Sequence, residues 1–263
     1  MKKIGIIGGS GFCSFDELTV ENRVPCTTPW GEPSSPLIVG SFENIADEQV
    51  EVVFLPRHGE DHQFPPHKVN YRANISALKE QQVSVIYAVN VVGGINMEMC
   101  PGDLVIPDQV IDYTWGREHT YSDGTDLGTN LGSDGDGIET SLQHVDFTYP
   151  YDQSLRNNLL QQAIKLGLHV HAGGVYGATQ GPRLETAAEI ARMQRDGCDV
   201  VGMTGMPEAA LARELDVPYG CLALVVNMAA GLGEKEITMA QIHKIIDDRM
   251  VQVRQLLTAV VKL

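Results

Sequence analysis

The sequence predicts an α/β fold in which one domain, residues 1–263, holds a central mixed sheet with helices on both faces. Short β-branched runs end in Gly or polar residues, which is typical of buried strands. Segments with helical spacing alternate with these runs, and no linker separates them. At 263 residues the chain is long enough for one large hydrophobic core.

Four apolar runs are predicted as strands, and each ends in a loop that suits an anion. The runs and their loops are 3–7 with Gly8 to Gly11, 52–56 with Arg57-His58-Gly59, 83–89 with 90–94, and 199–203 with Thr204-Gly205. In open α/β sheets, ligands bind beyond the carboxyl ends of the strands. We therefore expect hydroxyl, guanidinium, imidazole and N–H groups from four loops to meet around one phosphate.

Further elements follow from apolar periodicity and from Gly and Pro boundaries. Helices are predicted at about 67–81, 152–166, 183–195, 207–215 and from 238 onward, and strands at 103–107, 171–178 and 219–226. The last helix opens with Thr238-Met239-Ala240-Gln241, a capping-box pattern, and its apolar stripe is interpreted as core packing. The Gly- and Asp-rich stretch 112–146 lacks calcium-loop spacing, and its length favours a lid, an interface element or disorder.

Composition limits the partners that we expect. Hydrophobic residues make up 43% and charged residues 20%, and the net charge of −15 argues against nucleic acid. No apolar run approaches the roughly 20 residues needed to span a membrane, and no signal-peptide pattern is present. Five scattered cysteines without a C-x-x-C pair favour reduced thiols. We expect a cytoplasmic protein without a membrane partner.

A dinucleotide site is excluded at the first turn, because the third glycine and the downstream acidic residue are missing. That turn is better interpreted as N–H groups with one hydroxyl, Ser10. Each loop taken alone has a simpler explanation, since Thr204 would also cap the next helix and an exposed Arg-His pair is commonly only solvated. Their joint occurrence favours a phosphate site.

Six motifs, in order along nearly the whole chain, together resemble the trimeric purine nucleoside phosphorylase and methylthioadenosine phosphorylase family. They are Ile4 to Gly11, Pro56-Arg57-His58-Gly59, Lys68 to Asn74, Pro101-Gly102-Asp103, Gly181-Pro182-Arg183 and Gly202 to Glu208. The resemblance implies a nucleoside phosphorylase-like fold, in which inorganic phosphate attacks C1′ of a purine nucleoside. It implies a nucleoside and phosphate as substrates, and no metal or organic cofactor.

The same resemblance assigns the phosphate site. Ser10, Arg57, His58, the loop at Asn90-Val91 and Thr204 would hold phosphate, and Met203 would lie against the ribose. Position 90 is Asn where the family often has Thr or Ser, and this departure leaves the contact of that loop open. The residue types suit the chemistry, since an anion below C1′ stabilises an oxocarbenium-like sugar and an Arg fork binds phosphate well.

The base-reading residues point to a 6-oxopurine. Asn227 and Ala229 stand where adenine-specific relatives carry an Asp-x-Asp pair, and an amide can donate to a 6-oxo group as well as engage N7. Glu185, after Leu184, matches the position from which 6-oxopurine phosphorylases accept N1–H. Adenine has no N1–H, and an unpaired buried group costs about 1–3 kcal/mol. Asn227 and Glu185 are therefore the predicted catalytic residues, with Leu184 and Ala229 as substrate contacts.

The 5′ end of the sugar is predicted to contact Met239, whose polarizable thioether suits a methylthio group. His144 resembles a histidine that a neighbouring subunit contributes, and with the family resemblance it implies a homotrimer. His243 is interpreted as a residue of the last helix unless the register brings it into the site. The combination suggests S-methyl-5′-thioinosine as the substrate.

Three alternatives stay open at this stage. The first is an S-methyl-5′-thioadenosine phosphorylase, the second is a general inosine and guanosine phosphorylase, and the third is a non-catalytic nucleoside-binding module. Hydrolysis by water would leave Arg57 and Thr204 without an obvious role.

Overall fold

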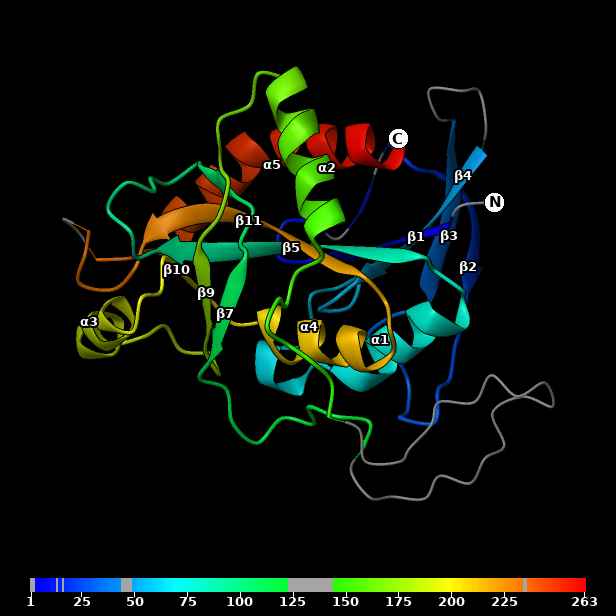
Figure 1. The fold of residues 1–263 in the computed structure, drawn as a ribbon, viewed down its shortest axis with the longest axis horizontal. Coiled ribbons are helices and arrows are strands. Elements are labelled where there is room, and N and C mark those ends of the chain that lie inside the picture. Colours follow the sequence, from blue (N-terminus) through cyan, green and yellow to red (C-terminus); the bar gives the residue numbers. More distant parts are fainter. Residues whose placement is uncertain (1–2, 13, 16, 44–48, 123–143, 234–235) are drawn as a thin grey trace.

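The computed structural model describes residues 3–12, 14–15, 17–43, 49–122, 144–233 and 236–263. Most of the predicted loop at 112–146 and Cys13 therefore lie outside the described residues. The described chain forms an 11-stranded mixed sheet flanked by helices, which confirms the predicted fold class (Figure 1). The strands are β1 (Lys3–Gly8), β2 (Thr19–Val24), β3 (Leu37–Glu43), β4 (Gln49–Pro56), β5 (Val85–Gly94), β6 (Leu104–Val105), β7 (Gln109–Asp112), β8 (Val170–His171), β9 (Val175–Ala178), β10 (Val200–Gly202) and β11 (Tyr219–Met228).

The helices pack on both faces of the sheet. They are α1 (Tyr71–Glu80), α2 (Gln153–Lys165), α3 (Ala187–Arg195), α4 (Gly205–Glu214) and α5 (Met239–Val261), with a 3₁₀ turn at Pro66–Lys68. Helices α1 and α4 share one buried cluster, in which Leu78 and Leu211 are fully buried. Helices α2 and α5 lie on the opposite face of the sheet (Figure 1). They share a second buried cluster through Leu159 and Leu257. Two cores on opposite faces fix the sheet that carries the site loops.

Strand β5 is the centre of the sheet. It pairs in parallel with β1 through Ile7 and Ala88, and with β11 along nearly its whole length. Beyond the end of β1, β5 continues and pairs with β10, with Val200 opposite Gly94. The pairing of β5 with β10 is antiparallel. Thr204 therefore reaches the site because β10 returns beside the end of β5.

Several predicted boundaries differ from the structure. The strand predicted at 171–178 is two short strands, β8 and β9, separated by a turn in which Gly174 has a φ of +142°. That left-handed value favours glycine. The helix predicted at 67–81 starts at Tyr71, because Asn70 accepts a hydrogen bond from the N–H of Ala73 and caps it. Of the part from 67 to 70, residues 67 and 68 belong to a 3₁₀ turn that starts at Pro66.

Helix capping also differs from the prediction. At α5, Thr238 accepts from the N–H of Gln241, which is one half of the predicted capping box. A complete box forms at α3 between Thr186 and Glu189, so α3 starts at Ala187 rather than directly after Pro182. The segment from Pro182 to Glu185 is therefore not helical, and it extends along the cavity described below.

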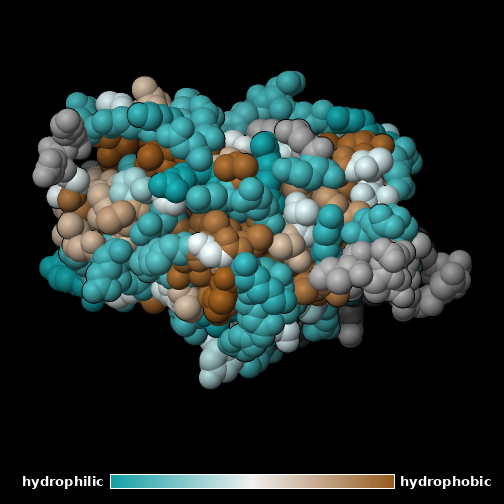
Figure 2. Space-filling view, turned by 90° about the horizontal axis from the view of Figure 1, so that it is seen from above, coloured by the Kyte–Doolittle hydropathy of each residue, from teal (hydrophilic) through white to brown (hydrophobic). Residues whose placement is uncertain are grey.

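The surface is mainly hydrophilic, with smaller apolar areas between polar side chains, as Figure 2 shows for the face seen from above. This pattern agrees with the net charge of −15. Within the described residues, none of the helices combines the length and the apolar character that crossing a membrane requires.

Candidate active site

A cavity of about 720 Å³ opens where the loops after β1, β4, β9, β10 and β11 meet the end of β5 and the start of α5. The loop predicted at 90–94 is wrong, because these residues continue strand β5. Most of the predicted site residues line the cavity: Ser10, Arg57, His58, Val91, Leu184, Glu185, Met203, Thr204, Asn227, Ala229 and Met239. Asn90 lies behind this surface, and His144 is exposed elsewhere on the described protomer. Loops far apart in the sequence thus converge on one space large enough for a nucleoside and an anion.

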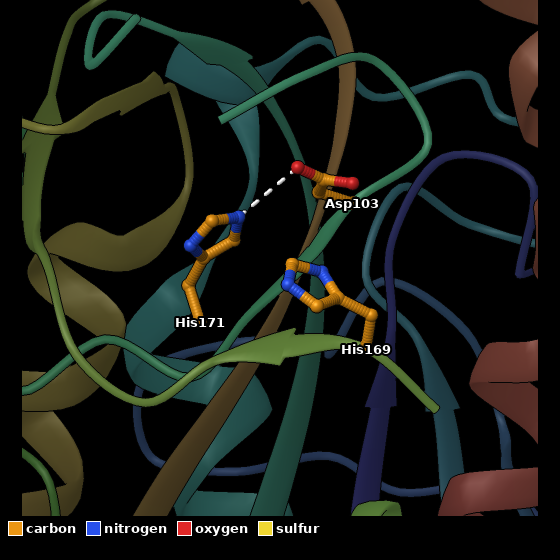
Figure 3. Close-up of side chains that lie close together, drawn as sticks. All are labelled: Asp103, His169 and His171. Carbon is orange, nitrogen blue, oxygen red and sulfur yellow. Dashed lines mark hydrogen bonds and ion pairs between the residues drawn. The ribbon is translucent and has the colours of Figure 1, made fainter. Parts of the chain in front are cut away.

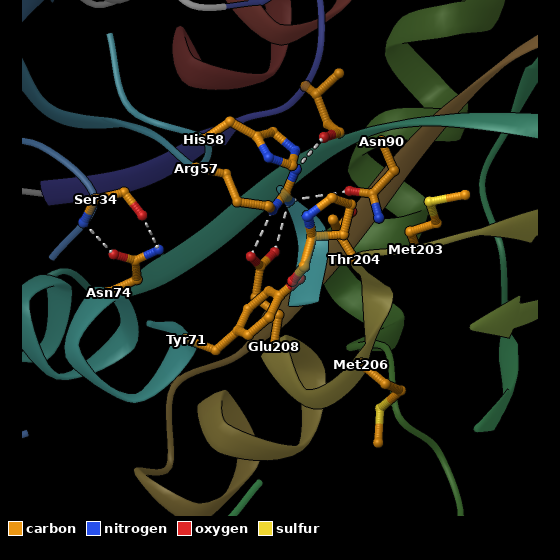
Figure 4. A network of polar contacts seen from close by, with 12 residues as sticks. Ser34, Arg57, His58, Tyr71, Asn74, Asn90, Met203, Thr204, Met206 and Glu208 are labelled. Carbon is orange, nitrogen blue, oxygen red and sulfur yellow. Dashed lines mark hydrogen bonds and ion pairs between the residues drawn. The ribbon is translucent and has the colours of Figure 1, made fainter. Parts of the chain in front are cut away.

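Arg57 is buried at the end of the cavity where the sequence predicts phosphate, between the turn after β1 and Thr204. This end is called the anion end below. The Arg57 side chain is fully buried, and its Nε and Nη2 each lie 2.7 Å from a carboxylate oxygen of Glu208. Nη2 also donates to Asn90 Oδ1 at 3.1 Å, and Nη1 donates to the carbonyl of Val89 at 2.9 Å (Figure 4). Burial opposes the charged guanidinium, but the attraction of Glu208 raises the pKa of Arg57 above its ordinary value. Arg57 is therefore cationic.

This arrangement corrects one expectation about Arg57. The two-pronged edge of the guanidinium, expected to bind phosphate, is occupied by Glu208. Nη1 is the nitrogen nearest the Gly-rich turn, since a Cβ added at Gly9 would lie 2.9 Å from it. The absence of a side chain at Gly9 lets the turn approach the cation closely.

Glu208 is a residue whose role the sequence analysis missed. It is fully buried in the first turn of α4, and Tyr219 Oη donates to its Oε1 at 2.7 Å. A carboxylate is favourable at a helix N-terminus, and this one also balances a buried arginine. The available signal was a lone acidic residue at the start of an apolar helical stretch, 207–212.

Asn90 supports the anion end from behind. It is 1% exposed, accepts from Arg57, and donates from Nδ2 to Tyr176 Oη at 3.3 Å. The same phenol oxygen accepts from the backbone N–H of Thr204 at 3.4 Å. A Cβ at Gly202 would lie 2.1 Å from Tyr176 Oη, so that position has no room for a side chain. Tyr176 thereby links strand β5, which carries Asn90, to the segment after β10 that carries Thr204.

His58 is held in one tautomer. Its Nδ1 lies 2.7 Å from the carbonyl of Phe64, which only accepts, so Nδ1 carries the proton. Burial, followed by the charge of Arg57, lowers the pKa of His58 to about 4. The neutral ring therefore presents Nε2 as an acceptor, which suits a phosphate hydroxyl. His62, whose pKa is also lowered by burial and by His243, lies 3.4 Å from Ser10 Oγ.

The predicted base readers come from two different segments. Asn227 lies near the end of β11, directly after a register shift between Val225 and Asn227, and such a bulge re-aims a side chain. Its Nδ2 donates to the carbonyl of Met228 at 2.8 Å. Glu185 Oε1 accepts from Thr179 Oγ1 at 2.6 Å. An amide and a carboxylate, both half-buried, thus line one cavity.

The end of the cavity next to α5 mixes apolar and polar groups. Ile237, Met239 and Ile242 line it together with His62, His243 and Asp247. Met239 is 58% exposed in the described protomer. The sequence did not decide whether His243 lies in the site or only on the last helix. In the structure it lies on the cavity wall.

Outside the cavity, Asp103, His169 and His171 lie close together, with one potential ligand atom of each within 4.8 Å of the others (Figure 3). His171 Nε2 donates to Asp103 Oδ2 at 3.0 Å, and the same oxygen accepts from the N–H of Cys100 at 2.8 Å. These bonds tie the turn before β6 to β8. The expectation of a metal-free protein is not tested by this cluster.

A mixed α/β sheet that brings an anion site next to an amide and a carboxylate defines the class of nucleoside phosphorylases. The chain matches the Phosphorylase superfamily over residues 3–262, and it belongs to this family.

Known relatives agree with this class. The chain is 46% identical to a probable S-methyl-5′-thioinosine phosphorylase of Pseudomonas syringae, over 99% of this chain and 98% of the relative. It is 43% identical to a 6-oxopurine nucleoside phosphorylase of Pyrococcus furiosus, over 100% and 93% of the two chains. The structure of methylthioadenosine phosphorylase from Schistosoma mansoni in complex with adenine is similar, with a TM-score of 0.87, 33% identity, and coverage of 99% and 91%.

Proposed function

We propose that the protein catalyses phosphorolysis of 6-oxopurine nucleosides, with S-methyl-5′-thioinosine as the preferred substrate. The products are hypoxanthine and 5-methylthioribose 1-phosphate, a reaction of purine salvage. The observation that carries the proposal is that Asn227 and Glu185 line the same cavity as Ser10, Arg57 and Thr204. The names of the relatives from Pseudomonas syringae and Pyrococcus furiosus support it.

In the proposed reaction, a phosphate oxygen forms a bond to C1′ while the bond from C1′ to N9 breaks and its electrons move to the purine. The attacking hydrogen phosphate gives up its proton and a purine nitrogen takes up a proton, so the products are the sugar phosphate and neutral hypoxanthine. Arg57, Ser10 and Thr204 hold the anion in place, which stabilises the positive charge that develops on the sugar. Asn227 donates to the departing base, and Glu185 accepts its N1–H. No covalent enzyme intermediate is required.

The test is a steady-state panel of S-methyl-5′-thioinosine, inosine, guanosine and S-methyl-5′-thioadenosine, with and without phosphate. We expect release of hypoxanthine from methylthioinosine only when phosphate is present, with the highest kcat/KM of the four. Preference for methylthioadenosine would contradict the base assignment. Nucleoside binding without any sugar phosphate would indicate a non-catalytic module.

A second candidate, a general inosine and guanosine phosphorylase, is favoured by one observation. His243 lines the cavity beside Met239, and an imidazole can hydrogen-bond a 5′-hydroxyl group. A kcat/KM for inosine equal to or above that for methylthioinosine would select this candidate.

We further propose a cytoplasmic homotrimer that needs no metal or organic cofactor. Support for the trimer comes from the family resemblance and from His144, which is exposed in the described protomer. Sedimentation analysis should give three times the mass of 28.6 kDa. Activity should be unchanged after dialysis against a chelator, and a loss restored by one metal would direct attention to Asp103, His169 and His171.

A further inference from the structure

Arg117, a buried arginine in the segment after β7, connects the two sides of the cavity. It is 9% exposed, and its N–H groups meet carbonyl and side-chain oxygens rather than a carboxylate. A guanidinium offers five N–H donors in a fixed plane, so its partners are held at set spacings.

One side of this guanidinium holds the segment that leads to the base-reading Glu185. Nη2 donates to the carbonyls of Thr179 and Gln180, at 3.1 and 2.8 Å. Nε donates to the side-chain oxygen of Gln180 at 3.1 Å. Thr179 in turn donates to Glu185 Oε1 at 2.6 Å. Arg117 is thus one residue removed from the carboxylate that faces the base.

The other side holds the segment that contacts ribose and phosphate. Nη1 donates to the carbonyls of Met203 and Met206, at 2.8 and 2.6 Å, on either side of Thr204. Nη1 also lies 3.3 Å from Tyr71 Oη, and the guanidinium carbon lies 5.4 Å from the centre of the Tyr71 ring. The partners of one planar group therefore flank both halves of the cavity.

We propose that Arg117 is a positioning residue that sets the distance between the base-reading segment 179–185 and the phosphate- and ribose-contacting segment 203–206. The inference rests on the proposed function, because it assigns the two segments to the base and to the anion. A lysine in this place keeps the charge but offers three donors on one nitrogen, which cannot span both segments. The enzyme would then hold either the base or the phosphate correctly, but not both at once.

The chain contains a matched control for this argument. Arg156 is also buried, at 7% exposure, and it too binds backbone carbonyls, those of Pro107 and Ala172, at 3.0 and 2.8 Å. It is not among the residues that line the cavity. Arg117→Lys and Arg156→Lys therefore remove comparable buried bonds, but only the first removes bonds to the site segments.

The experiment compares both variants with the wild type, using whichever nucleoside of the panel the wild type cleaves best. We expect Arg117→Lys to lower kcat about 10- to 100-fold and to raise KM for both nucleoside and phosphate, since a 1 Å misplacement can cost about 100-fold. Arg156→Lys should stay within about twofold of the wild type in kcat. Thermal melting should show both variants folded.

Two results would overturn the proposal. One is Arg117→Lys with kcat and both KM values within twofold of the wild type, and the other is an equal loss in Arg156→Lys. If Arg117→Lys does not fold, Thr179→Val tests the same connection at its last bond. It should reduce discrimination against the 6-amino nucleoside and leave KM for phosphate unchanged, and unchanged discrimination would contradict the proposal. If the proposed function itself is wrong, the wild-type enzyme will show it in the nucleoside panel, by releasing no hypoxanthine in the presence of phosphate.

Discussion

The two ends of the cavity are built in different ways. At the anion end, Arg57 and Glu208 are fully buried, and Asn90 and Thr204 are 1% and 7% exposed. At the nucleoside end, Leu184 and Met239 are 42% and 58% exposed in the described protomer. One end is a closed polar network, and the other is an open surface with few internal bonds.

The proposed function gives a reason for this difference. A phosphate requires fixed donors, and groups held rigidly need no reorganisation when charge develops. A nucleoside must enter and its base must leave, which requires exposed side chains. We therefore expect changes at the anion end to affect stability as well as activity, and changes at the nucleoside end to affect mainly the choice of substrate.

The largest expected effect is on folding. Arg57→Ala leaves the Glu208 carboxylate buried without its partner, which should lower the free energy of unfolding by about 3–5 kcal/mol. Arg183 makes a similar bidentate pair with Glu189, but their side chains are 67% and 45% exposed. Arg183→Ala should therefore cost much less, because water already solvates both charges. Urea unfolding of both variants measures the contrast, and equal losses would contradict it.

The second effect is a pH dependence of stability at the anion end. The pKa of His58 is about 4 in the folded protein, below its ordinary value of 6.5, so the unfolded chain binds the proton first as pH falls. The contribution of neutral His58 to the free energy of unfolding is therefore fully present above pH 6.5, and it is lost progressively as the pH falls from 6.5 to about 4. The pKa difference corresponds to a loss of about 3 kcal/mol.

The matched test is His58→Asn, whose amide can still donate to the carbonyl of Phe64. Measured by urea unfolding without phosphate, the variant should lose less stability than the wild type between pH 6.5 and 4. A His58→Asn profile parallel to that of the wild type would refute the assignment.

The third effect is on the nucleobase. Asn227→Asp replaces a donor with an acceptor, which suits the amino group of adenine and opposes a 6-oxo group. A mismatch of about 1–3 kcal/mol should change the ratio of kcat/KM for methylthioinosine and methylthioadenosine by roughly 5- to 150-fold toward the adenine substrate. Stability should change little, because Asn227 is half-buried. An unchanged ratio would remove Asn227 from the base site.

Part of the anion end could be predicted from the sequence, for a physical reason. Glycines and the residues that follow apolar strands are local signals, so the turn at Gly8 to Gly11 and the loop at Arg57 could be located directly. The partner of Arg57 could not, because Glu208 lies 151 residues away in the chain and meets it only through packing. The hydrogen bonds of Arg117 could not be predicted for the same reason, because their acceptors are also far away in the chain and meet Arg117 only through packing.

At the nucleoside end, the sequence could not show which residues of α5 face the cavity. The spacing between β11 and α5 left open whether Met239 or His243 lies in the cavity, and the structure places both on its wall. The sequence predicted a mixed sheet but could not tell which strand runs antiparallel, since an apolar run carries no information about strand direction.

The smallest expected effect concerns the 5′ pocket, where the ends of the two candidate sugars differ by a methylthio and a hydroxyl group. Met239→Ser removes the thioether, and contacts of this kind contribute about 0.3–1.5 kcal/mol. Because Met239 is 58% exposed, we expect a two- to fivefold loss in kcat/KM for methylthioinosine and no loss for inosine. His243→Ala should give the opposite pattern, with a loss for inosine alone. If Met239→Ser lowers kcat/KM equally for both substrates, Met239 does not distinguish the two sugars. Changes at the nucleoside end would then affect catalysis in general and not only the choice of substrate, contrary to the difference that we infer between the two ends.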